Sequence, residues 1–308
     1  ALSLSRLAAD LESVASPVLA AVLLAVISYH NLFVGTALGF ILSAGFVVTA
    51  VLPKLSASQS LPFLRRLTGG VKLFALTPRL RGLLAISLAT AAGGAMVFVN
   101  TVVLVQSNFG LSQQATAWAL AAFGGGSMTA AFLLPKTLER VTDRSAMVSG
   151  AVLMTAVLIA GALFARSYPV LIGLWIVMGF GYSLTITPAG RALRRSSTAA
   201  ERPALFAAQF ALSHACWLIA YPVAGLVSAE ADPQMAFVVL AGLCGLGTLL
   251  ALFVWPAHDP LNLLHDHHDM EPDHAHLSEG MRPDAEGVAH AHPVVIDDNH
   301  RRWPKNRV

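Results

Sequence analysis

Charged residues are scarce in this sequence, and that scarcity excludes most soluble folds. Only 12% of the 308 residues are Asp, Glu, Lys or Arg, whereas soluble domains average about a quarter. Hydrophobic residues make up 56% of the chain, and the mean hydropathy is +0.65. This balance is typical of a protein that lies mostly within a lipid bilayer.

The residues and motifs of common enzyme sites are also missing. The two cysteines, Cys216 and Cys244, both fall in apolar segments, which argues against a disulfide framework and against a paired-cysteine metal site. The chain has no Gly-rich phosphate loop ending in Lys-Ser or Lys-Thr, no Gly-x-Ser-x-Gly elbow and no His-Glu-x-x-His helix. We therefore predict that the protein is not an enzyme, has no ATP-driven motor and requires no cofactor.

The sequence does contain eight apolar segments, each near the roughly 20 residues that cross a bilayer as a helix. They cover residues 13–29, 32–52, 82–106, 115–134, 146–165, 169–188, 203–228 and 235–255. A backbone in contact with lipid must satisfy its own hydrogen bonds, so each segment is predicted to be helical. The expected fold class is an all-α membrane protein with about eight transmembrane helices.

A basic segment, residues 53–81, separates the second apolar segment from the third. It contains Lys and Arg residues but no Asp or Glu, and such segments are retained on the cytoplasmic side of a membrane. The loops that follow alternate between basic and neutral or acidic, which places both ends of the chain in the cytoplasm. The excess of positive charge therefore lies in membrane loops, and we expect no nucleic-acid partner.

Polar residues are distributed unevenly among the apolar segments. Residues 32–52, 146–165 and 235–255 are almost wholly apolar, whereas the segments between them carry polar groups at mid-depth. Every third helix is therefore compatible with lipid on all sides, which indicates three-helix units with one supporting helix each. The glycine run at residues 124–126 has no Lys of a phosphate loop after it and is predicted to allow close helix packing or bending.

This arrangement resembles the major facilitator superfamily of transporters. The basic segment is similar to the linker between that family's two six-helix halves. Pro135, Glu139 and Arg140 fall where the family has a Gly-x-Leu-x-Asp-Arg loop, with Pro in place of Gly and Glu in place of Asp. Ser16-Pro17 falls where antiporters of the family carry Gly-Pro. The resemblance implies that the polar helices line a central cavity and that the third helix of each unit stands outside.

The resemblance covers residues 1–256 and divides the chain into four parts. Residues 1–52 would hold the last two helices of the N-terminal half, 53–81 the cytoplasmic linker, 82–256 the six-helix C-terminal half and 257–308 a cytoplasmic tail. Eight spans in place of twelve predict a fragment of a longer transporter. A genuine eight-span protein is the alternative.

The tail, residues 257–308, is acidic and rich in histidine. It holds nine of the 11 His residues and few large apolar side chains, so it is predicted to be disordered. Imidazole favours Ni, Co and Zn, and we predict weak multivalent metal binding; a solvated tail with incidental affinity is the alternative. The candidate metal ligands are His265, His267, His268, His274, His276, His290 and His292.

The end of the tail also resembles that of bacterial nickel-resistance exporters of the same superfamily. The similar features are the His-x-His pairs and the segment at residues 296–304, which reads Ile-Asp-Asp-Asn-His-Arg-Arg-Trp-Pro. This resemblance implies a multi-pass protein of the bacterial inner membrane that exports a divalent metal.

Candidate pathway residues gather in the seventh apolar segment. Gln209, Ser213, Trp217 and Tyr221 recur at four-residue intervals, with His214 beside them. Such a stripe is costly against lipid, so we expect it to face the bundle interior. His214 is either a proton carrier or transient metal contact, or a structural His bonded to a neighbouring helix.

Three further polar residues are candidates in the third and sixth segments. Asn100, Tyr182 and Thr185 lie at depth in these segments. They either line the pathway or bond one helix to another, as polar residues between membrane helices commonly do.

Together these patterns predict a secondary transporter whose partners are the bilayer and a small solute, with protons as coupling ion by resemblance. The first candidate is efflux of a divalent metal such as nickel. The second is efflux of an organic compound, with a tail that only senses metal. The third is a membrane receptor or scaffold that transports nothing.

Overall fold

The computed structural model of this protein describes residues 29–50, 63–259, 262–266, 289–292, 294–296, 300 and 303. Most of the first predicted span, Ser16-Pro17 within it, and the four histidines at 267, 268, 274 and 276 lie outside these residues. The described elements are α2 (Tyr29–Thr49), α3 (Phe63–Leu76), α4 (Pro78–Val102), η1 (Val103–Asn108), α5 (Gln113–Thr137), α6 (Asp143–Phe164), α7 (Tyr168–Ile186), α8 (Ala189–Arg195), α9 (Arg202–Glu230), α10 (Pro233–Val254), β1 (Leu263–Asp266) and β2 (Ala289–His292).

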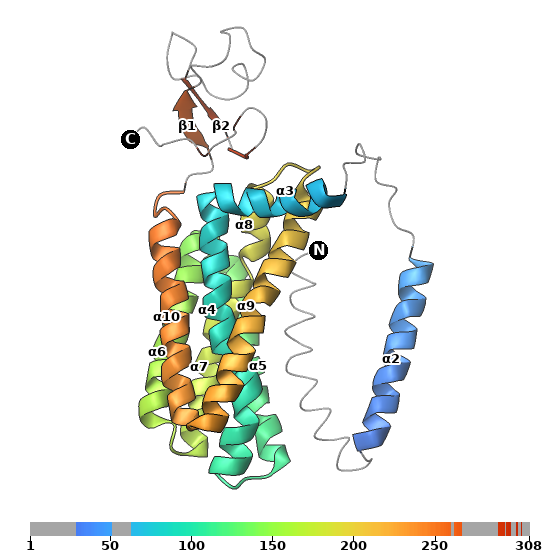
Figure 1. Cartoon of the computed structure of the whole chain (residues 1–308), viewed down its shortest axis with the longest axis vertical. Coiled ribbons are helices and arrows are strands. Elements are labelled where there is room, and N and C mark those ends of the chain that lie inside the picture. The colour runs from blue at the N-terminus through green and yellow to red at the C-terminus, as the bar shows by residue number, and fades with distance from the viewer. Residues whose placement is uncertain are drawn as a thin grey trace.

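Six of these helices form a bundle of membrane-spanning length, which confirms the predicted fold class. They are α4 with its extension η1, α5, α6, α7 continuing into α8, α9 and α10, and each is long and apolar enough to cross a bilayer. Figure 1 shows them standing side by side. α4 packs against α6, α7, α9 and α10 and is the most buried helix of the bundle. α2 corresponds to the second predicted segment.

The boundary between the basic segment and the third span differs from the prediction. α4 begins at Pro78, so the helix that contains the third predicted span also includes Arg79 and Arg81. Proline favours this first position because its missing N–H has no helical partner there. The linker also contains α3, which lies across one end of the bundle in Figure 1 and packs on α9. Leu73 and Phe74 are its buried side chains.

Glycine sets the distance between α5 and α7, as the glycine run predicted. A Cβ added to Gly126 would lie 1.9 Å from the carbonyl oxygen of Ile176, and one added to Gly179 would lie 1.8 Å from that of Phe123. Neither distance is compatible with a real side chain, so the two backbones touch at these positions. Gly125 meets nothing within 4 Å, and the requirement is therefore specific to Gly126.

The structure describes a short sheet and some buried side chains in the tail, and most of the tail lies outside the described residues. β1 and β2 pair as a two-stranded antiparallel sheet, in which Leu263 is the partner of His292 and His265 the partner of His290. Val294 and Ile296 are buried, and Ile296 joins the hydrophobic core of the bundle. The described part of the tail therefore packs on the bundle through an apolar side chain.

Candidate transport pathway

Five aromatic residues from four helices meet in what we call the aromatic cluster. They are Phe98 on α4, Phe123 on α5, Tyr182 on α7, and Trp217 and Tyr221 on α9. The ring centroid of Phe98 lies 5.5 Å from that of Phe123, 6.3 Å from that of Tyr182 and 6.1 Å from that of Trp217. The Phe123–Tyr182 and Trp217–Tyr221 distances are 5.3 and 4.9 Å. All four helices belong to the segments that the sequence marks as polar.

The aromatic cluster is partly open on the surface of the bundle. The exposed fraction is 45% for Phe98 and 41% for Tyr221. Gly94 makes room for the indole, because a Cβ there would lie only 2.2 Å from Cη2 of Trp217. An open group of rings offers flat contact area and cation–π contacts to an organic solute.

The polar stripe of α9 points partly toward α4. Gln209 donates from Nε2 to the hydroxyl of Ser87 at 3.3 Å, while its Oε1 is buried and has no hydrogen-bond partner among the described residues. The hydroxyl of Ser213 donates to the carbonyl of Phe210 in its own helix. α9 is also the least buried spanning helix. In its most apolar 18-residue stretch 17% of the residues are buried, against 78% in α4. Its stripe is therefore available for contacts beyond those described.

In the described part of the bundle, the contacts of His214 are with its own helix. Its side chain is exposed, its ring lies 3.9 Å from that of Phe210, and its Nδ1 is 2.7 Å from the carbonyl oxygen of the same residue. The polarity of a stripe identifies a helix face but not what covers it. The His214 side of α9 lies outside the packing contacts of the described bundle.

Asn100 and Thr185 lie inside the bundle and bond between helices. Asn100 is fully buried, and its Nδ2 donates to the carbonyl of Ala224 on α9 at 3.4 Å; its Oδ1 has no hydrogen-bond partner in the described chain. Thr185 receives a 2.9 Å hydrogen bond from Thr90 and donates to the carbonyl of Tyr182. These contacts are of the kind expected for polar residues that bond one helix to another. Of the candidates Asn100, Tyr182 and Thr185, only Tyr182 belongs to the aromatic cluster.

Two residues of the aromatic cluster, Phe98 and Phe123, were not predicted. A phenylalanine in an apolar helix carries no signal that separates a lipid-facing ring from one that lines a site. The nearest hint is Gly94, one turn before Phe98, but a glycine in a Gly/Ala-rich helix is not distinctive either.

A second group of polar residues lies at the end of the bundle where α4 begins and α10 ends, and we call it the charged end. It contains Arg79, Asp143, Arg191, Arg195 and Asp259. The carboxylate of Asp143 is 3.2 Å from Nε of Arg191 and 3.7 Å from Arg195. Its oxygens accept no well-aligned hydrogen bond in the described chain, so this pairing is by charge.

Asp259 stays ionised because of its neighbours at the charged end. Burial opposes the charged form, but the hydrogen bond and charge of Arg79, the hydrogen bond from Trp255 and the charge of Arg195 outweigh it. Together they hold the pKa of Asp259 below its ordinary value of 3.8. The tail thus starts with a carboxylate that remains charged at any physiological pH.

Among the predicted metal ligands, the structure brings three together by backbone register. His265 is the strand partner of His290, and His292 lies two residues further along the same strand. In the described residues no group of three His, Cys, Asp or Glu side chains is arranged to hold an ion.

Comparison with known proteins identifies the family. The family model of the Major Facilitator Superfamily matches residues 83–283, from α4 through α10 and into the tail. No curated protein matches this sequence. The matched region contains all four helices of the aromatic cluster and two of the three predicted supporting helices, α6 and α10. The chain therefore belongs to the major facilitator superfamily, and it is a multi-pass membrane protein of the secondary-transporter class.

Proposed function

We propose that this protein exports a divalent metal such as nickel from the cytoplasm of a bacterium, in exchange for protons. The observation that carries the proposal is a histidine-rich tail held at the charged end of the bundle. Asp259 fixes the start of the tail to Arg79, and the register of β1 and β2 makes His265 and His290 backbone partners. Cross-strand partners in antiparallel pairs generally have Cβ atoms about 5 Å apart.

The orientation follows the positive charges. In this proposal α3, the charged end and the tail lie in the cytoplasm of an inner-membrane protein, because Lys and Arg are retained there. The tail then collects metal on the side from which it is exported. Residues 82–256 act as the C-terminal half of the transporter, and the open aromatic cluster and the stripe of α9 border the route.

His214 is the proposed functional residue of α9 on this route. Its exposed imidazole is adjacent to Ser213 in the chain. It serves either as proton carrier or as a transient metal contact. A purely structural role, with the ring held by Phe210, is the competing explanation.

A second candidate function is efflux of an organic compound, and the aromatic cluster favours it. Five rings from α4, α5, α7 and α9 suit a flat or cationic organic solute, whereas a hydrated metal ion gains little from them. In that case the tail senses metal, or binds it incidentally, and the solute passes the rings.

The two candidates separate in one accumulation experiment. The full-length gene is expressed in a metal-sensitive host, and cellular nickel, cobalt, zinc and a cationic aromatic dye are measured in parallel. We expect lower nickel accumulation, with a smaller reduction when the seven candidate tail histidines are changed to Gln. Lower dye with unchanged metal supports the organic solute, and no change in any solute supports the receptor or scaffold.

The role of His214 needs a matched pair of variants. His214→Ala should abolish proton-dependent efflux at unchanged protein level, whereas Phe210→Ala, which only removes the neighbouring ring, should not. Normal efflux by His214→Ala would remove this residue from the mechanism.

A further inference from the structure

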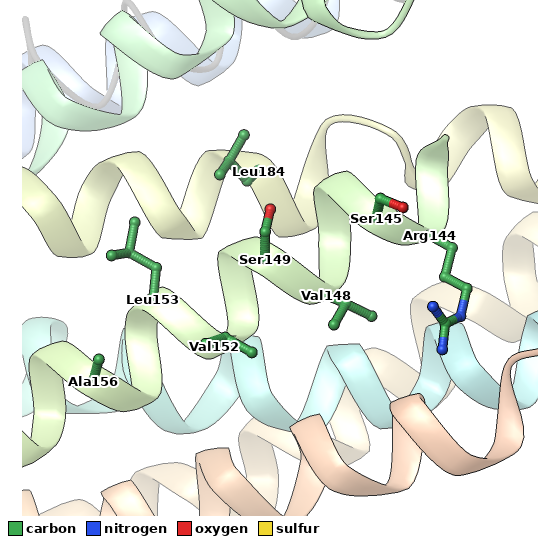
Figure 2. Close-up of a pocket in the computed structure, with 8 residues that line it drawn as sticks. All are labelled: Arg144, Ser145, Val148, Ser149, Val152, Leu153, Ala156 and Leu184. Carbon is green, nitrogen blue, oxygen red and sulfur yellow. The ribbon is translucent and has the colours of Figure 1, made fainter. Parts of the chain in front are cut away.

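An open groove of about 640 Å³ runs along α6, away from the aromatic cluster. Figure 2 shows that its lining comes from successive turns of α6, with Leu184 of α7 beside them. Arg144 and Ser145 lie at the charged end of the groove. Val148, Val152 and Ala156 follow along the helix, away from the charged end. One end of the groove is therefore cationic and the rest is mainly apolar.

Arg144 differs from the other arginines at this end. Arg79, Arg191 and Arg195 each pair with Asp143 or Asp259. Arg144 instead donates from Nε to the carbonyl of Trp255 at 2.8 Å and from Nη2 to that of Leu252 at 3.2 Å. Among the described residues it pairs with no carboxylate, so its charge is not neutralised by the part of the protein that is described.

The length of the groove matches one leaflet of a bilayer. Arg144 and Ala156 are 12 residues apart on one helix, a rise of about 18 Å. The hydrocarbon region of one leaflet is about 15 Å thick. A molecule that places an anionic group at Arg144 and a hydrocarbon chain along Val152 therefore has the proportions of a phospholipid.

We propose that this groove binds an anionic phospholipid, with the phosphate at Arg144 and one acyl chain along Val148, Val152 and Ala156. A guanidinium fits phosphate oxygens through parallel N–H donors, and Nη1 of Arg144 has no described acceptor. A zwitterionic headgroup gains less here, because the adjacent carboxylate in the chain, Asp143, is buried and paired with Arg191 and Arg195.

Native mass spectrometry of the full chain in detergent tests the site. The protein is titrated with phosphatidylglycerol, with phosphatidylcholine and with inorganic phosphate. We expect the phosphatidylglycerol affinity to exceed that for phosphatidylcholine and to fall about tenfold in Arg144→Gln, the loss of one charge-assisted contact. Arg140→Gln, an exposed arginine outside the groove, serves as the control.

A second pair of variants leaves Arg144 and its contacts with α10 intact. Val152 and Ile159 are equally exposed on α6, at 49% and 50%, but only Val152 lines the groove. Val152→Trp should lower the lipid affinity, and Ile159→Trp should not. The proposal is overturned if the two tryptophan variants bind alike, or if inorganic phosphate displaces the lipid, which would indicate a site for the free anion.

Discussion

Arg79 and Asp259 form a two-point ion pair across 180 residues of sequence. Nε of Arg79 is 2.7 Å from Oδ2 of Asp259, and Nη2 is 2.6 Å from Oδ1. The remaining nitrogen of Arg79 donates to the hydroxyl of Ser196 and to the carbonyl of Arg195, and the ring of Trp303 lies 5.7 Å from the guanidinium carbon. One arginine thus joins the first and last helices of the bundle to the tail.

Asp259→Asn should destabilise the bundle and release the tail. The substitution keeps the shape of the side chain but leaves the buried guanidinium of Arg79 without a counter-charge, which costs about 3 kcal/mol. Thermal unfolding in detergent measures the loss, and limited proteolysis of the tail measures its release. Glu139→Gln removes an exposed carboxylate of the same protein and should change neither; equal effects of the two variants would contradict the role of the ion pair.

The same ion pair predicts how stability depends on pH. The pKa of Asp259 is lowered in the folded protein, so its stabilising contribution is complete above the unfolded value of about 4. It is lost only as the pH falls through the lower, folded pKa. The difference in unfolding temperature between wild type and Asp259→Asn should therefore be constant from neutral pH down to about pH 5, and it should shrink in stronger acid. A difference that already disappears near pH 6 would show that another group controls the tail.

Neighbouring glycines in α5 should respond differently to the same substitution. Gly126→Ala places a Cβ against the carbonyl of Ile176, and overpacking of this kind costs about 2 kcal/mol. Gly125→Ala meets nothing within 4 Å and should be neutral or slightly stabilising, because alanine favours the helix. Fluorescence-detected gel filtration after heating compares the two variants. Equal melting temperatures would mean that α5 and α7 are not packed as closely as described.

The spans could be predicted from the sequence because bilayer thickness sets their length, but the charged end could not. The local sequence groups Arg79 with a basic linker, and its partner, Asp259, lies 180 residues later. A local charge count places arginine outside the membrane helix by default. Burying an unpaired arginine is costly. The ion pair with Asp259 offsets that cost at the first turn of α4, which begins at Pro78.

The candidate site was predictable only in part for a similar reason. The four-residue spacing of Gln209, Ser213, Trp217 and Tyr221 identifies one face of α9, and the structure places Trp217 and Tyr221 in the aromatic cluster. The spacing cannot tell which neighbour covers that face, and so His214 was expected inside. Phe98 and Phe123 join the site only because four helices converge there, which is a property of the assembled bundle.

Trp217 should be the most sensitive position of the aromatic cluster. Its indole contacts both Phe98 and Tyr221 and fills the space above Gly94. Trp217→Ala removes a ring contact worth about 1.4 kcal/mol, and we expect the initial transport rate to fall about tenfold. The rate is measured in everted membrane vesicles with the solute identified by the accumulation experiment, and it is normalised to the amount of protein.

The adjacent residue provides the control for this prediction. Leu218 is 75% exposed on α9 and is not part of the hydrophobic core, so Leu218→Ala alters the surface of the same helix turn and leaves the five rings of the cluster unchanged. A loss of transport confined to Trp217→Ala assigns the effect to the rings, because both variants remove apolar volume from α9. Equal rates in the two variants would contradict a role of the Trp217 ring in transport.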